Sequence, residues 1–171
     1  MTLTRRRWLA GLLMGGLLTG CSFKLRGTGS DQAMFETVYL RFDDSVPQGL
    51  RSALRQIFQS TGVQEVDSTG LADLVVELGR FKRDINQTSR SVSGQTTAEL
   101  IRLSQRVEAY RMRDEKLILE LDSVLLRDRQ IDPVQRLAAD RELQTITEEM
   151  THALARQIFD QVNRSYRLAE L

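Results

Sequence analysis

The fold is decided by residues 74–125, which read LVVELGRFKRDINQTSRSVSGQTTAELIRLSQRVEAYRMRDEKLILELDSVL. At the start of this stretch apolar and polar residues alternate, and the phase then changes: Leu74, Val76 and Leu78 are followed by Phe81 and Ile85. Alternation is typical of a half-buried strand. Because the phase changes at Gly79, and glycine inside a strand often marks a bulge, we expect one long strand with a β-bulge at this residue.

The middle of the stretch admits two interpretations. Residues 88–94 are polar and predict a flexible hairpin tip. Beyond it, Leu100, Leu103, Val107 and Tyr110 fit a helix, whereas Ile101, Leu103, Val107 and Ala109 fit a strand. Periodicity does not decide between them. The next segment is a clearer strand, with Leu117, Leu119, Leu121 and Leu125 on one face after a turn at Asp114 and Glu115. Pairing across so short a turn favours three consecutive antiparallel strands.

The flanking segments complete the expected fold. Residues 37–42 predict a short strand, and residues 47–61 predict an amphipathic helix that begins near Pro47 and ends at Gly62. A long helix after Asp132 and Pro133 carries one apolar stripe, made of Leu143, Ile146, Met150, Leu154, Ile158 and Val162. Two helices that each carry one apolar stripe can bury these stripes against one apolar face of a sheet. We therefore expect an α+β fold, a two-layer sandwich of two helices on a four-stranded, mostly antiparallel sheet.

The N-terminus predicts export and lipidation. Three arginines at positions 5–7 precede an apolar run that ends at a lipobox, Leu18-Thr19-Gly20-Cys21. The run is shorter than the roughly 20 apolar residues needed to cross a bilayer, so it predicts a signal peptide and not a span. Cys21 is the only cysteine of the chain, and its thiol is the nucleophile that would take up lipid. A buried structural cysteine is the alternative interpretation.

These features divide the chain into a signal peptide at residues 1–20, a lipidated tether at 21–35 and a single domain at 36–171. Residues 4–9 also fit a twin-arginine export motif, although a general positively charged signal is the simpler interpretation. Loss of the signal removes three of the 24 basic residues and leaves the 23 acidic ones, so the formal charge changes from +1 to −2. This balance does not indicate a nucleic-acid-binding protein.

The sequence offers little catalytic chemistry. His152, the only histidine, lies in the last predicted helix without the second histidine and glutamate of a helical zinc site. Serines such as Ser60, Ser68 and Ser104 lack a nearby base and a nucleophile-elbow pattern. We expect a binding or assembly protein and no enzyme, with no metal and no cofactor apart from the covalent lipid on Cys21.

Two motifs carry a family resemblance. Residues 21–27, Cys-Ser-Phe-Lys-Leu-Arg-Gly, resemble the mature start of the lipopolysaccharide-assembly lipoprotein family LptE, and residues 94–99, Gly-Gln-Thr-Thr-Ala-Glu, are similar to its stretch after the hairpin. The resemblance implies two helices on four strands, so the segment from Gln95 would be a strand. It also implies a plug inside a large outer-membrane barrel of the LptD type, which helps that barrel assemble and deliver lipopolysaccharide to the cell surface. Ser22 is consistent with sorting to the outer membrane.

Direct contact with the anionic groups of lipopolysaccharide is a further hypothesis. The candidates are Lys82, Arg83 and Arg90 near the hairpin and Arg136 and Arg141 near the last helix, because arginine matches phosphate in bidentate fashion. Solvated surface charges are the alternative. The family has basic residues where this chain has Val92 and Ala139, which weakens the assignment. Two other readings are an envelope lipoprotein that binds a small or peptidoglycan-related ligand without a barrel, and an envelope enzyme.

Overall fold

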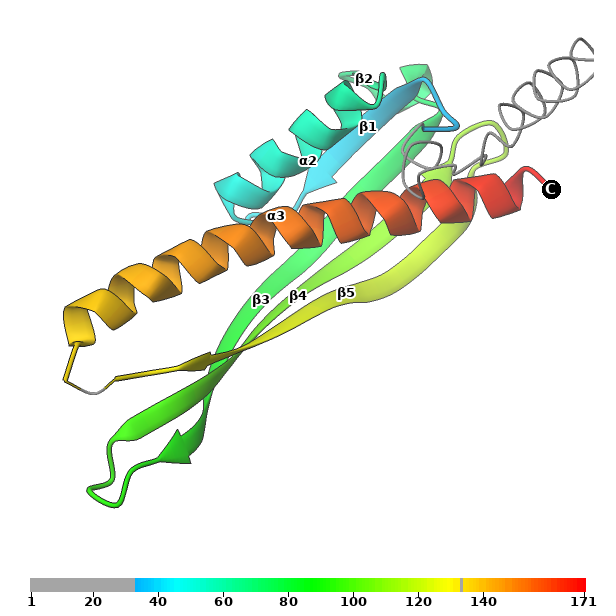
Figure 1. Cartoon of the computed structure of the whole chain (residues 1–171). Coiled ribbons are helices and arrows are strands. Elements are labelled where there is room, and N and C mark those ends of the chain that lie inside the picture. Colours follow the sequence, from blue (N-terminus) through cyan, green and yellow to red (C-terminus); the bar gives the residue numbers. More distant parts are fainter. Residues whose placement is uncertain (1–32, 133) are drawn as a thin grey trace, which may run out of the picture. The chain divides into compact units, whose positions relative to one another are not determined.

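The computed structural model describes residues 33–132 and 134–171. The predicted signal peptide, the lipobox, Cys21 and the motif at residues 21–27 lie outside the described residues. Among those described, two helices cover one face of a five-stranded sheet (Figure 1). The elements follow in the order β1 (Thr37–Phe42), α2 (Gln48–Ser60), β2 (Gln64–Glu65), a 3-10 turn (Thr69–Leu71), β3 (Leu74–Arg90), β4 (Thr96–Arg111), β5 (Lys116–Gln130) and α3 (Arg136–Ala169).

The predicted α+β sandwich is confirmed, with two differences in the sheet. Its strand order is β2-β1-β3-β4-β5, so it has five strands where four were expected. The additional strand, β2, is a two-residue Gln-Glu bridge with no apolar alternation to reveal it. The sheet is also mixed, because β1 runs parallel to both β2 and β3. Helix α2 supplies the crossover that a parallel pair requires.

The three long strands pair as the sequence predicted. β3 and β4 are antiparallel, as are β4 and β5, so the ambiguous segment after Gln95 is a strand and not a helix. The register of β3 against β4 shifts between Leu78 and Phe81, which confirms the bulge at Gly79. Gln105, which is buried opposite this bulge, donates from Nε2 to the carbonyl of Gly79 at 2.8 Å. Its amide thus satisfies a carbonyl that the bulge leaves outside the regular ladder.

The core lies between the sheet and the two helices. Leu50, Leu54 and Phe58 of α2 pack with Ile158 and Phe159 of α3 in one buried cluster. The sheet contributes the inward residues of β1, β3 and β4. Phe35 closes the cluster: the centroid of its ring lies 6.1 Å from that of Phe58 and 5.1 Å from that of Tyr166, and the rings are tilted. Phe35, the last residue of the predicted tether, therefore belongs to the core of the domain.

Asp73 joins the start of β3 to β1. Its Oδ2 accepts hydrogen bonds from the backbone N–H of Glu36 and Thr37 and from the hydroxyl of Thr37, at 2.9 to 3.0 Å. Desolvation of the carboxyl group raises its pKa, but the hydrogen bonds from Thr37 and Glu36 together outweigh this effect, so the pKa is lowered from the usual 3.8. The ionised form of Asp73 is therefore the one that fastens β1 to β3.

Helix α3 is fastened to the sheet at both of its ends. Near its start, buried Arg129 of β5 donates to the carbonyl of Ala139 at 2.6 Å. At its end, buried Arg111 of β4 hydrogen-bonds the carbonyl of Ala169 and pairs with Glu170 at 3.2 Å. A cation at a helix C-terminus also complements the helix dipole. Two buried arginines from different strands therefore hold the two ends of α3.

Candidate functional site

The candidate site is the end of the domain where β3 and β4 extend beyond α2. Past the bulge, β3 has no partner among the described strands other than β4, and its residues 82–90 are exposed. The hairpin closes through backbone hydrogen bonds from Ser91 to the carbonyl of Gln95 and from Gly94 to that of Ser91. Gly94 has φ +81°, a backbone conformation that suits glycine. Val92 at the tip is fully exposed, so the tip itself buries nothing.

A largely buried ion pair links the first turns of α3 to the sheet next to this hairpin. Arg129 Nη2 lies 2.9 Å from Glu99 Oε2, which joins β5 to β4, while the same guanidinium donates to the Ala139 carbonyl. Sequence reasoning missed this pair. Arg129 continues the inward phase of Leu121 and Leu125, so strict alternation along β5 contained the signal. The guanidinium would have been recognised as an inward-facing cation that needs an acidic partner.

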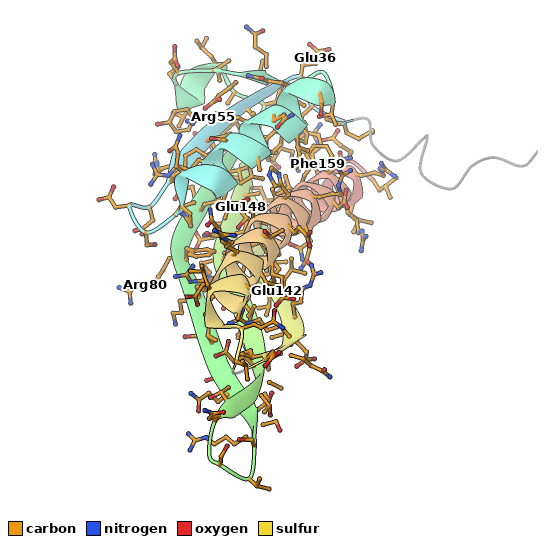
Figure 2. The ribbon with its side chains drawn as sticks, turned by 60° about the vertical axis from the view of Figure 1, so that its left-hand side comes forward. Glu36, Arg55, Arg80, Glu142, Glu148 and Phe159 are labelled. Atoms are coloured by element: carbon orange, nitrogen blue, oxygen red, sulfur yellow. The ribbon has the colours of Figure 1, made fainter. Side chains whose placement is uncertain are left out.

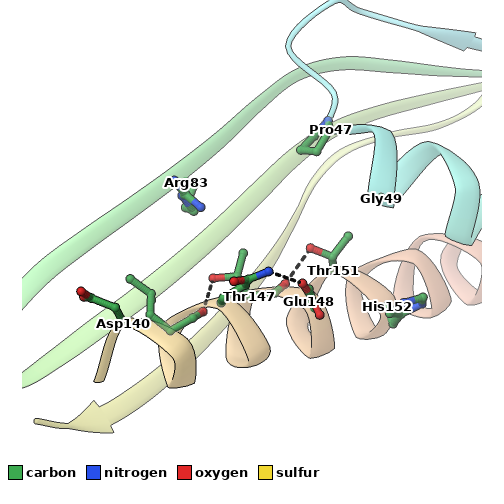
Figure 3. Close-up of a pocket in the computed structure, with 10 residues that line it drawn as sticks. Pro47, Gly49, Arg83, Asp140, Thr147, Glu148, Thr151 and His152 are labelled. Atoms are coloured by element: carbon green, nitrogen blue, oxygen red, sulfur yellow. Dashed lines mark hydrogen bonds between the residues drawn. The ribbon is translucent and has the colours of Figure 1, made fainter. Parts of the chain in front are cut away.

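A groove runs along α3 on the side of the bulge. It has a volume of about 400 Å³ and is lined by residues of α2, β3 and α3: Pro47, Gly49, Arg83, Asp140, Leu143, Gln144, Thr147, Glu148, Thr151 and His152. Figure 3 shows Arg83 of β3 on one side of the groove and the α3 residues on the other, with the start of α2 at one end. The hydroxyl groups of Thr147 and Thr151 donate to backbone carbonyls one turn earlier in α3, so the methyl groups of these residues face the groove.

The structure separates the basic residues that the sequence grouped together. After the bulge Phe81 packs against the core side, so Arg83 shares that side and Lys82 points to the opposite face of the sheet. Arg90 lies near the tip, where it donates to Gln87 Oε1 at 2.8 Å. One ligand group therefore cannot contact Lys82 and Arg83 on the same face.

The two candidates on α3 lie at its start. Arg136 is the first residue of the helix, and its side chain is outside the described part of the chain. Arg141 is exposed on the first turns. Asp140 and Glu148 line the groove together with Arg83, so the groove carries mixed charge and is not a basic cleft.

The two positions that depart from the family pattern have different surroundings. Val92 is fully exposed at the hairpin tip, whereas Ala139 lies in the first turn of α3 and is buried. Arg129 brings a guanidinium directly to Ala139, but this group is buried and already paired with Glu99. It therefore does not replace an exposed basic residue at position 139.

No metal or membrane-spanning element is found in the described part of the chain. Among residues 33–132 and 134–171, no group of three or more histidine, cysteine, aspartate or glutamate side chains could hold a metal ion. His152 is exposed beside the groove. Over the same residues, no helix has the length and apolar character to cross a membrane.

The pattern of strands, hairpin and terminal helix matches a known family. A family model described as lipopolysaccharide-assembly, LptE, covers residues 35–162. The chain belongs to the LptE family. The match extends from the buried Phe35 to the last turns of α3, so it includes the groove and the hairpin. The family resemblance seen in the sequence is therefore confirmed.

Solved structures share this LptE fold at low sequence identity. The crystal structure of rare lipoprotein B from Shewanella oneidensis is 18% identical, covers 80% of this chain and 100% of its own, and has a TM-score of 0.71. An uncharacterised lipoprotein B from Nitrosomonas europaea is 20% identical over 82% and 90% of the two chains, with a TM-score of 0.69. A minor lipoprotein from Acinetobacter baumannii is 17% identical over 78% and 95%, with a TM-score of 0.62. No curated protein sequence matches the chain.

Proposed function

We propose that this LptE-family protein is an outer-membrane lipoprotein, anchored through lipid on Cys21, that plugs a lipopolysaccharide translocon barrel of the LptD type. In this role it assists assembly of the barrel and supports insertion of lipopolysaccharide at the cell surface. The family match over residues 35–162 carries the proposal. Several of the solved proteins that share the fold are themselves described as lipoproteins, which supports the anchor. Such a role requires no catalytic group.

The face of the sheet that no helix covers carries polar side chains, which supports placing the protein in an enclosed, water-filled space. Two cross-strand ion pairs lie on this face: Arg41 lies 2.7 Å from Glu77, and Arg106 is paired with Glu120. Exposed pairs of this kind contribute little to stability, typically about 0–1 kcal/mol. They do keep this part of the sheet face polar. Such a face suits a water-filled barrel lumen better than a lipid surface.

The test is a pull-down of tagged full-length protein from envelopes solubilised in mild detergent, with partners identified by mass. We expect a large barrel protein in stoichiometric amount. The matched control is Cys21→Ser, which removes the lipid acceptor and leaves residues 33–171 unchanged. We expect this variant to leave the membrane fraction and to recover less barrel. Recovery of the unmodified lipoprotein alone, at native expression, would refute the barrel role.

Binding of a small or peptidoglycan-related ligand without a barrel is the second candidate function. The groove of about 400 Å³ beside α3 favours it, because this volume can hold a small ligand. The two functions differ in what co-purifies. A ligand binder would be recovered free of barrel protein, with a small molecule detectable by mass after denaturation.

Direct contact with lipopolysaccharide remains a finer proposal on the basic residues Lys82, Arg83, Arg90, Arg136 and Arg141. Arg83 is the strongest candidate whose side chain the structure describes, because it lines the groove. We expect Arg83→Glu to weaken binding of purified lipopolysaccharide about tenfold, as expected when one charge-assisted contact becomes a repulsion. Arg164→Glu is the matched control, since Arg164 is exposed on the far half of α3. Equal losses in the two variants would indicate a general charge effect.

A further inference from the structure

Beyond Gly79, β3 has an edge that no other described strand pairs with. β1 pairs with β3 from Val38 opposite Leu74 to Phe42 opposite Leu78, and this pairing ends at the bulge. The last contacts on that side are from Asp43 N–H to the carbonyl of Leu78 and from Phe81 N–H to Ser45 Oγ. Beyond them, no described strand lies beside residues 82–90 on the side away from β4. An edge of this kind presents unpaired backbone N–H and C=O groups.

The groove lies directly over this free edge. It is bordered by Arg83 of β3, by Leu143 and Thr147 of α3, and by Pro47 at the start of α2 (Figure 3). A strand added to β3 would lie about 4.8 Å from it, in line with β1, and would direct every second side chain toward the helices. Those side chains would enter the groove. The groove between the two layers therefore leaves room for side chains of an additional strand.

The charge of this edge selects the kind of strand. Residues 79–90 contain four basic side chains, Arg80, Lys82, Arg83 and Arg90, and one acidic side chain, Asp84. None of the four basic groups forms an ion pair within the described part of the chain. Figure 2 shows Arg80 pointing away from the sheet. β5, the edge strand on the opposite side, carries three basic and three acidic residues and is balanced.

We propose that the free edge of β3 binds an extended acidic segment of a partner protein as an additional strand. Backbone pairing would give affinity, and basic side chains such as Lys82, on the face away from the groove, would select acidic residues on that face, because the groove itself also contains Asp140 and Glu148. A second copy of this chain is a poor occupant, because two such edges would place like charges side by side. Any extended acidic segment in the envelope could supply the strand, which takes this inference beyond the barrel of the proposed function.

The test is hydrogen exchange of the full-length protein in mild detergent, measured by mass spectrometry. The probe is a short synthetic peptide of alternating threonine and glutamate, compared with its threonine–lysine counterpart and with inorganic phosphate. We expect the acidic peptide alone to slow exchange in residues 79–90, with no change in β5. Equal protection by both peptides would overturn the proposal. Protection by phosphate alone would overturn it in favour of an anion site, and full protection before any peptide is added would overturn it because the edge would not be free.

A charge-reversal variant sharpens this test. We expect Lys82→Glu with Arg83→Glu to weaken binding of the acidic peptide about tenfold, as for two surface ion pairs turned into repulsions. The control is Lys116→Glu with Arg164→Glu, which changes the net charge equally at exposed positions away from the edge. Equal losses would overturn the role of this edge. If the first variant does not fold, the salt dependence of peptide binding to the unmodified protein replaces it, and binding that does not weaken with salt overturns the charge selection.

Discussion

The two halves of β3 belong to one strand but have different surroundings. Before Gly79 the strand has β1 and β4 on either side and helices above it, and Leu74, Val76 and Leu78 are buried. After Gly79 it has only β4 beside it among the described strands, and residues 82–90 are exposed. Apolar side chains that alternate along β3 are therefore buried only where the strand has a neighbour on each side and a helix layer above it. We conclude that stability resides in the first half and that the second half is available for binding.

Leucine and isoleucine truncations in the two halves should have very different effects. Leu78 is 2% exposed and Ile85 is 38% exposed. We expect Leu78→Ala to lower the free energy of unfolding by about 2–5 kcal/mol, since it leaves a cavity in the core. Ile85→Ala should lower it by less than about 1 kcal/mol, because little packing is lost. Urea unfolding followed by circular dichroism measures both. Similar losses would mean that the second half is packed as tightly as the first.

Arg129, the buried arginine under α3, tests how the start of α3 is held beside the second half of β3. We expect Arg129→Ala to lower the free energy of unfolding by about 3 kcal/mol, because Glu99 and the Ala139 carbonyl lose their partner away from water. Arg127→Ala is the control on the same strand, since its pair with Glu149 at 2.7 Å is exposed and is worth less than about 1 kcal/mol. If the two variants are equally stable, the start of α3 does not depend on the buried pair.

The bulge that separates the two halves can be probed with a side chain. A Cβ at Gly79 would lie 3.2 Å from Cγ and 3.3 Å from Cβ of Arg106, so the Arg106 side chain must give way by a few tenths of an ångström. We expect Gly79→Val to lower the free energy of unfolding by about 1–3 kcal/mol through overpacking. Gly70→Val is the control, because a Cβ there meets no atom within 4 Å. Equal stability of both variants would show that the bulge has room to adjust.

The smallest effect is expected at the junction of β1 with the first half of β3. The pKa of Asp73 is lower in the folded protein than its usual 3.8, so its stabilising contribution is complete above that value and is lost as the pH falls through the folded pKa. We expect Asp73→Asn to lower the free energy of unfolding at neutral pH by about 1 kcal/mol. Its stability should also vary less below pH 3.8 than that of the unmodified protein. Parallel pH profiles from unfolding experiments would contradict this expectation.

The sequence by itself determined those elements whose signal is local. The bulge at Gly79, the strands on either side of the ambiguous segment and the long helix with one apolar stripe follow from periodicity over a few residues. The family resemblance also resolved the segment after Gln95, which periodicity left open. The basic candidates were found as residue types, and the structure adds that Lys82 and Arg83 point to opposite faces of the sheet.

Only the tertiary structure decided which segments meet. β2 has two residues and no pattern of its own, so its place beside β1 depends on where α2 returns the chain. Arg129 and Arg111 lie in an inward phase that the sequence contains, yet their partners come from β4, from the turn before β5 and from α3. The groove and the free edge arise because β3 extends along the sheet beyond both β1 and α2. Periodicity reports the environment of one segment, whereas pairing, burial of charge and unfilled space depend on contacts between segments far apart in the chain.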